Sequence, residues 1–301
     1  IASKGSSTFS AITPMGRQHE NDREATAADL KWLADPAEEP EPFGDGGTKM
    51  AWNTFNVVSI YPNGNPVMSD VNQRWVGDCC ACAVIASMAY LYPRFVKHII
   101  KDNMDKTYTV TMYDPKGKQI SVGVGGDYFI GNSGDLGALG GRNKEVTWAT
   151  ILEKAMIKWN QIYQGSSNVG GIGTEYVSAI FTGDGESVGF GANALIAEDL
   201  QRAVEVSLKQ GRLVIGGFTR SGEQVDQNWQ TTSGHAFTFI LPDDNTHLFK
   251  MRNPWGGTTD GVMKVKDDGR IPPMIDLRIC APGAAKNYGV GPDLGGYIPN
   301  F

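Results

Sequence analysis

The segment Gln73–Cys79, which reads Gln-Arg-Trp-Val-Gly-Asp-Cys, constrains this chain more than any other feature. An almost entirely apolar run from Ala81 to Leu91 follows it. This pattern predicts a turn that opens a buried helix with a thiol at its N-terminus. A helix N-terminus carries partial positive charge and unpaired N–H groups, which stabilise a thiolate. A glutamine six positions upstream can direct its side-chain amide to the same place as an oxyanion donor.

A histidine far downstream is the best candidate base for this thiol. His235 follows Gly234 and begins an apolar segment, which predicts a rigid position at the start of a strand in a cleft wall. The other three histidines lie in less favourable places: His19 in a polar segment, His98 next to a lysine, and His247 after a turn. A base that removes the thiol proton makes the cysteine a good nucleophile.

Asn253 supplies a third group in the order that such chemistry requires. It lies in the segment Arg252-Asn253-Pro254-Trp255, and its side chain could accept the second N–H of the imidazole and orient the ring. Trp255 could shield that bond from water. The order Cys, His, Asn along the chain is that of the cysteine-protease triad.

Composition limits the class of protein. The chain has 301 residues, 41% of them hydrophobic and 20% charged, which indicates a folded domain or two lobes that share a cleft. The net charge of −6 and the lack of a block of Lys and Arg argue against nucleic acid as a partner. No apolar run approaches the roughly 18 residues of a membrane-spanning helix. Composition does not indicate an oligomeric state.

The four cysteines do not form a disulfide framework or a zinc site. Cys79, Cys80 and Cys82 crowd into four positions, whereas a disulfide scaffold would spread them along the chain. Neither a histidine nor a second cysteine pair stands at zinc-ligand spacing. We therefore interpret Cys80, Cys82 and Cys280 as small buried hydrophobic residues.

Periodicity predicts an α+β protein whose first part is mainly helical. Residues 1–48 are a polar arm or pro-region with a short helix over Ala25–Leu33. Residues 49–186 form a helical lobe that carries Cys79. We expect its elements to be a helix from Cys79 to Leu91 that stops at Pro93, a hairpin over Tyr108–Val124, a loop over Gly125–Arg142 and an amphipathic helix over Trp148–Tyr163.

The second part of the chain is mainly strand. Residues 187–280 form a β-rich lobe that carries His235 and Asn253, and the boundary between the lobes falls near Thr182–Phe190. Residues 281–301 are a tail rich in Gly and Pro. The expected elements of the β-rich lobe are a helix over Ala192–Gln210 and strands over Leu213–Phe218, Ala236–Leu241, Leu248–Arg252, Val262–Val265 and Ile275–Cys280.

Four motifs in this order give a family resemblance over roughly residues 60–280. They are Gln73–Cys79, the Leu-Glu-Lys-Ala helix Trp148–Tyr163 with the Phe-Thr-Gly that follows it, Gly234–Ala236 and Arg252–Gly256. On these motifs the chain resembles the calpain-like cysteine proteases of the papain superfamily, and most of all the bacterial Tpr-type thiol proteases. The resemblance implies a papain-like fold with the cleft between two lobes, and protein or peptide substrates.

The resemblance also implies roles for individual residues in a calcium-dependent cysteine endopeptidase. Cys79 would attack the scissile carbonyl to give a thioester acyl-enzyme, His235 would carry the proton, and Asn253 would hold the ring. Gln73 and the Cys79 N–H would form the oxyanion hole. Extended substrate would bind to the backbone at Gly171 (or Gly170) and Gly234, as an added strand does, with Trp255 nearby.

Calcium enters only through the resemblance. Asp70, nine residues before Cys79, matches a calcium ligand, and backbone oxygens around Asn63 and Asn65 would complete the site. Glu145 is a further candidate, although it is one residue out of register. Oxygen ligands of this kind suit Ca²⁺, while the alternative role for Asp70 is a helix N-cap. For a second calcium site only Asp260 and Asp267-Asp268 remain.

The chain departs from the family pattern directly after the nucleophile, where Cys80 stands in place of the usual Trp. This removes an aromatic wall and raises the question of which thiol reacts. The register to Gln73 and to Gly77-Asp78 favours Cys79. A disulfide between Cys79 and Cys80 would be strained and would abolish activity.

Two other classes of function stay open at this stage. A catalytically silent calpain-like module could bind extended peptides or calcium, although the intact Gln, Cys, His and Asn argue against it. A transglutaminase-type acyl transferase also orders Cys before His, but usually orients the imidazole with an aspartate. The start at Ile1 leads us to expect autoprocessing of a longer precursor, and an exported or cell-surface location in a bacterium is a further expectation.

Overall fold

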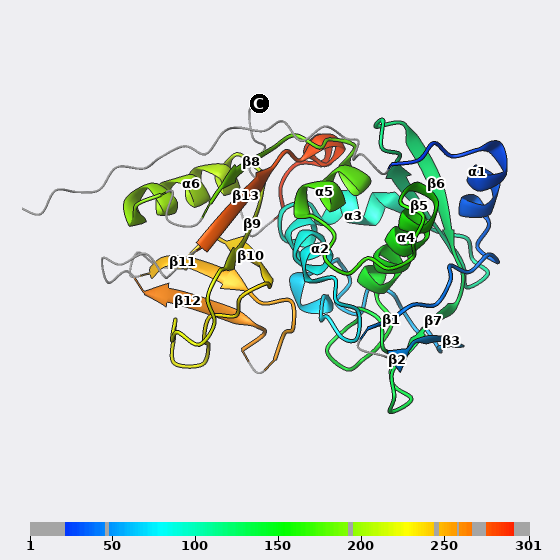
Figure 1. Ribbon diagram of the computed structural model, residues 1–301, viewed down its shortest axis with the longest axis horizontal. Coiled ribbons are helices and arrows are strands. Elements are labelled where there is room, and N and C mark those ends of the chain that lie inside the picture. The colour runs from blue at the N-terminus through cyan, green and yellow to red at the C-terminus, as the bar shows by residue number, and fades with distance from the viewer. Residues whose placement is uncertain are drawn as a thin grey trace, which may run out of the picture.

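A computed structural model gives two lobes that meet along one central helix (Figure 1). The cysteine lobe comprises residues 22–182, and the β-rich lobe comprises the strands and helix between 187 and 280. Expectations for Ile1, His19 and Asp267-Asp268 lie outside the described residues, as do residues 292–301 of the tail. The structure describes residues 22–45, 48–191, 195–243, 247–257, 259–266 and 275–291.

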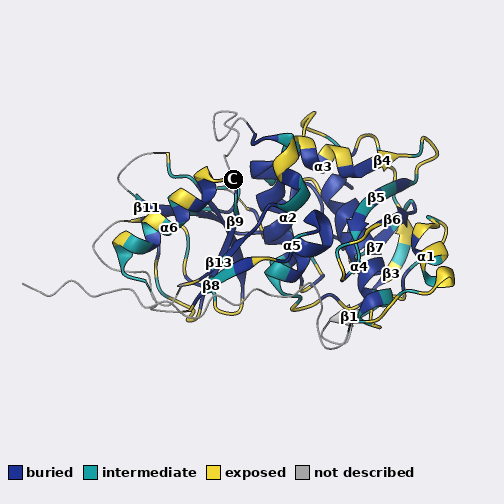
Figure 2. Ribbon diagram, turned by 90° about the horizontal axis from the view of Figure 1, so that it is seen from above, coloured by how far each residue is buried: buried dark blue, intermediate teal, exposed yellow. Residues whose placement is uncertain are grey.

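The central helix, α2 (Cys79–Leu91), lies between the lobes as the apolar run predicts. It contacts α4 and α5 on one side and strands β9 and β10 on the other. Every residue from Ala81 to Leu91 is buried, and Figure 2 shows both α2 and β9 in dark blue. The hydroxyl of Thr238 donates to the carbonyl of Ala83 at 2.7 Å, which ties the sheet to the helix. The helix thereby holds Cys79 at the junction of the two lobes.

Helix α2 ends at Leu91, before Pro93, as the sequence predicts, but the segment that follows is helical too. A second helix, α3 (Pro93–Ile99), begins there at a bend of 114°. Proline is well accommodated at a first helical position because its missing N–H would have no partner there. Among the described helices none alone is long and apolar enough to cross a membrane, and α2 with α3 meets that criterion only as this bent pair.

The cysteine lobe contains the predicted hairpin and amphipathic helix together with elements that the sequence did not reveal. Within the segment predicted as a loop, Asp127–Ile130 forms β7 and pairs with β3, so the prediction is wrong for these four residues. The short helix α5 was not predicted either. The elements are η1 (Met68–Asp70), α4 (Trp148–Tyr163) and α5 (Thr174–Thr182), the sheet β4 (Ile100–Asp102), β5 (Tyr108–Tyr113) and β6 (Gln119–Val124), the pair β3 (Ala51–Thr54) and β7 (Asp127–Ile130), and the pair β1 (Gly44–Asp45) and β2 (Thr48–Lys49).

The N-terminal arm packs on this lobe through two buried lysines of α4. Lys158 donates to the carbonyls of Asp35 at 2.9 Å and Gly123 at 2.8 Å, and Lys154 forms an ion pair with Glu39 at 2.6 Å. The arm contains α1 (Ala27–Ala34), whose Leu33 is fully buried. Helix α4 therefore holds the arm through polar contacts of these two lysines.

The β-rich lobe is one antiparallel sheet of six strands in the order β12-β11-β10-β9-β13-β8. Helix α6 (Ala197–Lys209) contacts β9 and β11 and ends before Gly211, whose positive φ of 73° suits a helix stop. The predicted strands are confirmed to within a residue, whereas β8 and the 3-10 turn η2 (Gly283–Tyr288) were not predicted. The strands are β8 (Ser187–Phe190), β9 (Leu213–Phe218), β10 (Ala236–Ile240), β11 (His247–Arg252), β12 (Val262–Lys266) and β13 (Ile275–Cys280).

Candidate active site

The thiol of Cys79 lies at the first turn of α2, half-buried at the junction of the lobes. Its pKa is lowered to about 4. The largest cause is the thiol of Cys80, which donates to it; the side chain of His235 and the backbone N–H of Ala236 add to the effect. Together these outweigh burial, which raises the pKa. The site therefore stabilises a thiolate at neutral pH.

His235 and Asn253 are brought together from the ends of two adjacent strands. Nε2 of His235 lies 2.8 Å from Oδ1 of Asn253. An amide oxygen can only accept, so Nε2 carries the proton and Nδ1 is the nitrogen left for the thiol. Asn253 is only 1% exposed, and its backbone N–H donates to the carbonyl of Gly261 at 2.8 Å. The orienting amide is thus held by the surrounding loop.

Trp255 covers the imidazole from the solvent side. Its ring lies 4.4 Å from that of His235, centroid to centroid, at 33°. Its backbone N–H also donates to Oδ1 of Asn253 at 3.0 Å. The indole is 51% exposed, so it both screens the His235–Asn253 hydrogen bond and presents an apolar surface to the cleft.

Gln73 approaches the same site from the cysteine lobe. Its backbone N–H donates to the carbonyl of Pro254 at 2.8 Å, which joins the loop before Cys79 to the loop after Asn253. Its side-chain Nε2 donates to the carbonyl of Val76 at 2.9 Å. An amide nitrogen carries two hydrogens, so one N–H is left that can act with the Cys79 N–H on an oxyanion.

The two glycines expected to bind substrate both have left-handed backbone conformations. Gly171 has φ of 73° and Gly234 has φ of 65°, and a side chain at either would face open space. These conformations favour glycine. The N–H of Gly171 donates to the carbonyl of Gly77 at 3.3 Å, which exceeds the usual upper limit of about 3.2 Å. Both glycines are exposed, which leaves their backbone accessible to an extended chain.

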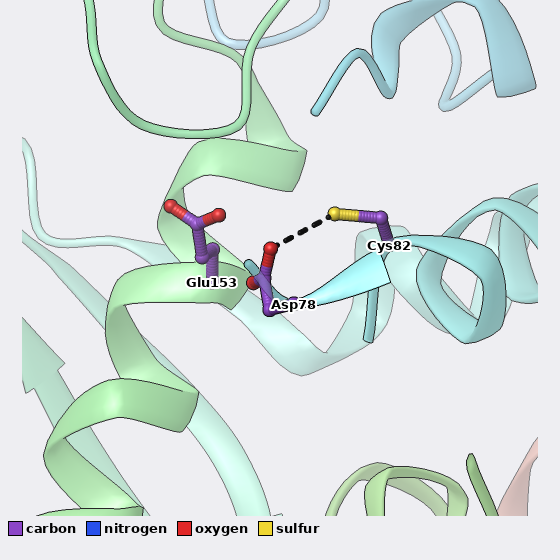
Figure 3. A group of neighbouring side chains, drawn as sticks. All are labelled: Asp78, Cys82 and Glu153. Carbon is purple, nitrogen blue, oxygen red and sulfur yellow. Dashed lines mark hydrogen bonds between the residues drawn. The ribbon is translucent and has the colours of Figure 1, made fainter. Parts of the chain in front are cut away.

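Behind the nucleophile lies a buried group that sequence reasoning missed (Figure 3). The ligand atoms of Asp78, Cys82 and Glu153 all lie within 4.8 Å of one another. The Cys82 thiol donates to Asp78 Oδ1 at 3.3 Å, and the Leu139 N–H donates to Glu153 Oε1 at 3.1 Å. Among the described residues, no N–H or hydroxyl donates to Asp78 Oδ2 or Glu153 Oε2.

Burial raises the pKa of both carboxyl groups, and that of Glu153 lies well above its usual value. We therefore expect the pair to hold a proton, with a protonated Glu153 as the donor to Asp78. Burial also raises the pKa of Cys82, which favours the protonated thiol that donates to Asp78. We interpret the group as a brace that links α4 to the residue before the nucleophile.

The calcium ligands expected from the resemblance are engaged in other contacts. The carboxylate of Asp70 accepts from the Trp148 indole at 2.7 Å, from the Asn63 amide at 2.7 Å and from the Val67 N–H at 3.3 Å. Asn63 therefore turns a donor, not an oxygen, toward Asp70. Of the expected ligands, only Glu145 keeps a buried oxygen, Oε2, that meets no donor among the described residues.

A lysine donates hydrogen bonds to two further oxygens of the loop around Asn63 and Asn65. Lys97 Nζ lies 3.0 Å from the Gly64 carbonyl and 3.2 Å from Asn65 Oδ1. Ca²⁺ requires six to eight oxygen ligands, and the residues as arranged do not provide that cage. At the second expected site, Asp260 forms ion pairs with Arg142 at 2.9 Å and Arg252 at 3.4 Å. The first place as arranged does not fit a calcium ion, and the second includes Asp267-Asp268, which lie outside the described residues.

Comparison with known proteins agrees with this geometry. Residues 52–261 match the model of the family described as calpain family cysteine protease. The match includes Gln73, Cys79, His235 and Asn253. A search of curated proteins found none that matches the chain.

The first prediction concerns Cys80. Cys80→Ala removes the largest cause of the lowered pKa of Cys79, so the rate of alkylation of Cys79 should rise at higher pH than in the wild type. The variant should keep most of its hydrolysis at neutral pH, because His235 and the Ala236 N–H remain. Mass spectrometry of the Cys79 peptide after iodoacetamide treatment measures the profile. Cys80→Ser, which keeps a donor, is the control. If the pH dependence of Cys79 alkylation is unchanged in Cys80→Ala, Cys80 does not lower the pKa of Cys79.

The second prediction concerns the buried brace. Glu153→Leu leaves Asp78 without its donor and should lower the free energy of unfolding by about 1–3 kcal/mol or more. Glu153→Gln should lose much less, because its amide can donate to Asp78 and accept from Leu139. Urea unfolding measures both. Equal losses in the two variants would show that the carboxyl pair shares no proton.

The third prediction concerns Asp70. Asp70→Ala leaves the buried indole N–H of Trp148 without an acceptor, so the variant should lose about 1–3 kcal/mol of stability. We expect the same loss with calcium and with chelator, measured by thermal unfolding. A calcium-dependent rise in Tm that is present in the wild type and absent in the variant would instead identify Asp70 as a calcium ligand.

Proposed function

The chain belongs to the calpain family of cysteine proteases, and we propose that it hydrolyses peptide bonds through Cys79, His235 and Asn253. The observation that carries the proposal is the hydrogen bond between His235 Nε2 and Asn253 Oδ1, with Nδ1 left for a thiol whose pKa is lowered to about 4. Thiolate, imidazole and orienting amide come from three separate segments, and their convergence has no evident purely structural need.

The chemistry follows from these positions. The Cys79 thiol gives its proton to Nδ1 of His235. The thiolate attacks the scissile carbonyl carbon, and the oxygen gains negative charge that the Cys79 N–H and the Gln73 amide stabilise. The C–N bond then breaks as His235 gives a proton to the leaving amine, which yields a thioester. His235 next takes a proton from water, the hydroxide attacks the thioester, and the acid leaves with the thiolate restored.

Two features support hydrolysis over the alternatives. Asn253 orients the imidazole where acyl transferases of the transglutaminase kind usually place an aspartate, and its carboxamide carries no charge to bind an amine. A silent binding module would have no need for a thiol with a strongly lowered pKa next to an oriented imidazole. Substrates are protein or peptide segments that bind extended between Gly171 and Gly234.

Calcium dependence is implied by the resemblance alone. Asp70 and Glu145 would supply the carboxylates, but Asp70 is bonded to Trp148 and Asn63. Calcium could enter only if these donors moved away. The proposed mechanism therefore takes no step through calcium.

The fourth prediction tests the nucleophile. An epoxide-type cysteine-protease label should attach to Cys79, located by peptide mapping, and Cys79→Ala should lower hydrolysis by about 10⁴-fold or more. Labelling is carried out with calcium and with chelator, so a calcium requirement would be seen directly. Absence of label in both conditions, after reduction to exclude a Cys79–Cys80 disulfide, would favour a silent binding module. Labelling of Cys80 alone would reverse the assignment of the nucleophile.

A further inference from the structure

A large cavity opens between the lobes next to the nucleophile. Its volume is about 710 Å³, which is within the range of small-molecule and side-chain pockets. Its lining includes Cys80 from the cysteine lobe and Gly234 and His235 from the β-rich lobe. Trp255 is not part of the lining, so the cavity lies on the Gly234 side of the imidazole. A substrate bound along Gly171 and Gly234 would pass its side chains over this cavity.

The cavity is open because small residues line the strands that form its wall. A Cβ at Gly217 would lie 2.6 Å from the His235 carbonyl oxygen and 3.1 Å from Asp276 Oδ1. A Cβ at Gly189 would lie 2.8 Å from Nη1 of Arg278. These glycines leave room for charged side chains inside the cavity. The substitution of Cys80 for the family's tryptophan removes another bulky group from the same lining.

Three charged side chains line the cavity. Glu175 comes from the first turn of α5, and Asp276 and Arg278 come from β13. Arg278 Nε lies 3.7 Å from Glu175 Oε2, which is longer than a hydrogen bond, and the two side chains are 33% and 13% exposed. One guanidinium thus stands against two carboxylates.

Both carboxylates lie close enough to Cys80 to influence the pKa of its thiol. Each raises the pKa of Cys80, although less than the neighbouring thiol and burial do. Apolar side chains complete the wall, among them Phe190 and Phe218. An apolar wall with acidic groups suits a long side chain that has an apolar stem and a cationic end.

On the basis of the proposed function, we propose that this cavity selects a Lys or Arg side chain on the amino-terminal side of the scissile bond. Glu175 and Asp276 are the specificity-determining residues, because they offer the carboxylate oxygens that a cation from the substrate can reach. Arg278 has the opposite effect: it repels a basic side chain and spaces the two carboxylates. An aliphatic side chain would bring no positive charge to these carboxylates.

The fifth prediction follows from this arrangement. When the enzyme digests a denatured protein mixture, mass spectrometry of the cleavage sites should show Lys and Arg enriched at one position before the scissile bond. In matched fluorogenic peptides, kcat/KM for a basic residue there should exceed that for Leu by about tenfold or more. In Glu175→Gln/Asp276→Asn this ratio should fall toward one. In Glu223→Gln, an exposed acid of the same lobe outside the cavity, the ratio should stay as in the wild type.

The outcomes separate the specificity from the activity. Cleavage with an aliphatic or acidic preference at every position, or a basic preference that survives the double substitution, would overturn the role of the cavity and leave the peptidase intact. The labelling rate of Cys79 in the double variant reports whether the site still assembles, and a normal rate with a reduced ratio supports the proposal. Failure of the wild type to cleave any protein would contradict the endopeptidase itself, and the specificity would fall with it.

Discussion

The site depends on the burial of α2 between the lobes. One face of this helix packs on α4 and α5 and the other on β9 and β10, so its N-terminus can lie in only one place relative to the sheet. That place brings Cys79 to the strand end that carries His235. Because protein interiors are close-packed, small shifts of the helix would be resisted by contacts on both sides. The geometry of the thiol and the imidazole is thus a consequence of packing.

Electrostatics at the helix N-terminus are arranged in two layers. On the cleft side, Cys80, His235 and the Ala236 N–H stabilise negative charge on Cys79. On the core side, Asp78 accepts from the Cys82 thiol next to the same helix end, and we expect Glu153 to hold a proton beside it. Without the shared proton, two buried carboxylates would repel each other behind a thiolate. The brace and the nucleophile are therefore parts of one charge arrangement.

Much of the site could be predicted from the sequence, and the reasons are local. The helix Cys79–Leu91, the helix Trp148–Tyr163 and the strand Leu213–Phe218 have strong periodicity and clear ends, and the structure has them at those bounds. The strand β7 was mistaken for a loop because its stability comes from pairing with β3, which a glycine-rich sequence does not indicate. The calcium ligands were predicted by matching the sequence to the family pattern. A sequence does not show the side-chain contacts that Asp70 makes with Trp148 and Asn63.

The sequence by itself determined which residue types are present and in what order: a thiol at a helix start, a histidine at a strand start, an asparagine in a tight turn, and a glutamine before the thiol. Only the tertiary structure decided how they meet, because their distances depend on how separate elements pack. It turned Nε2 of His235 to Asn253, paired Glu153 with Asp78, and gathered Glu175, Asp276 and Arg278 around one cavity. Periodicity describes a single element, whereas charge pairs between distant elements follow from the fold.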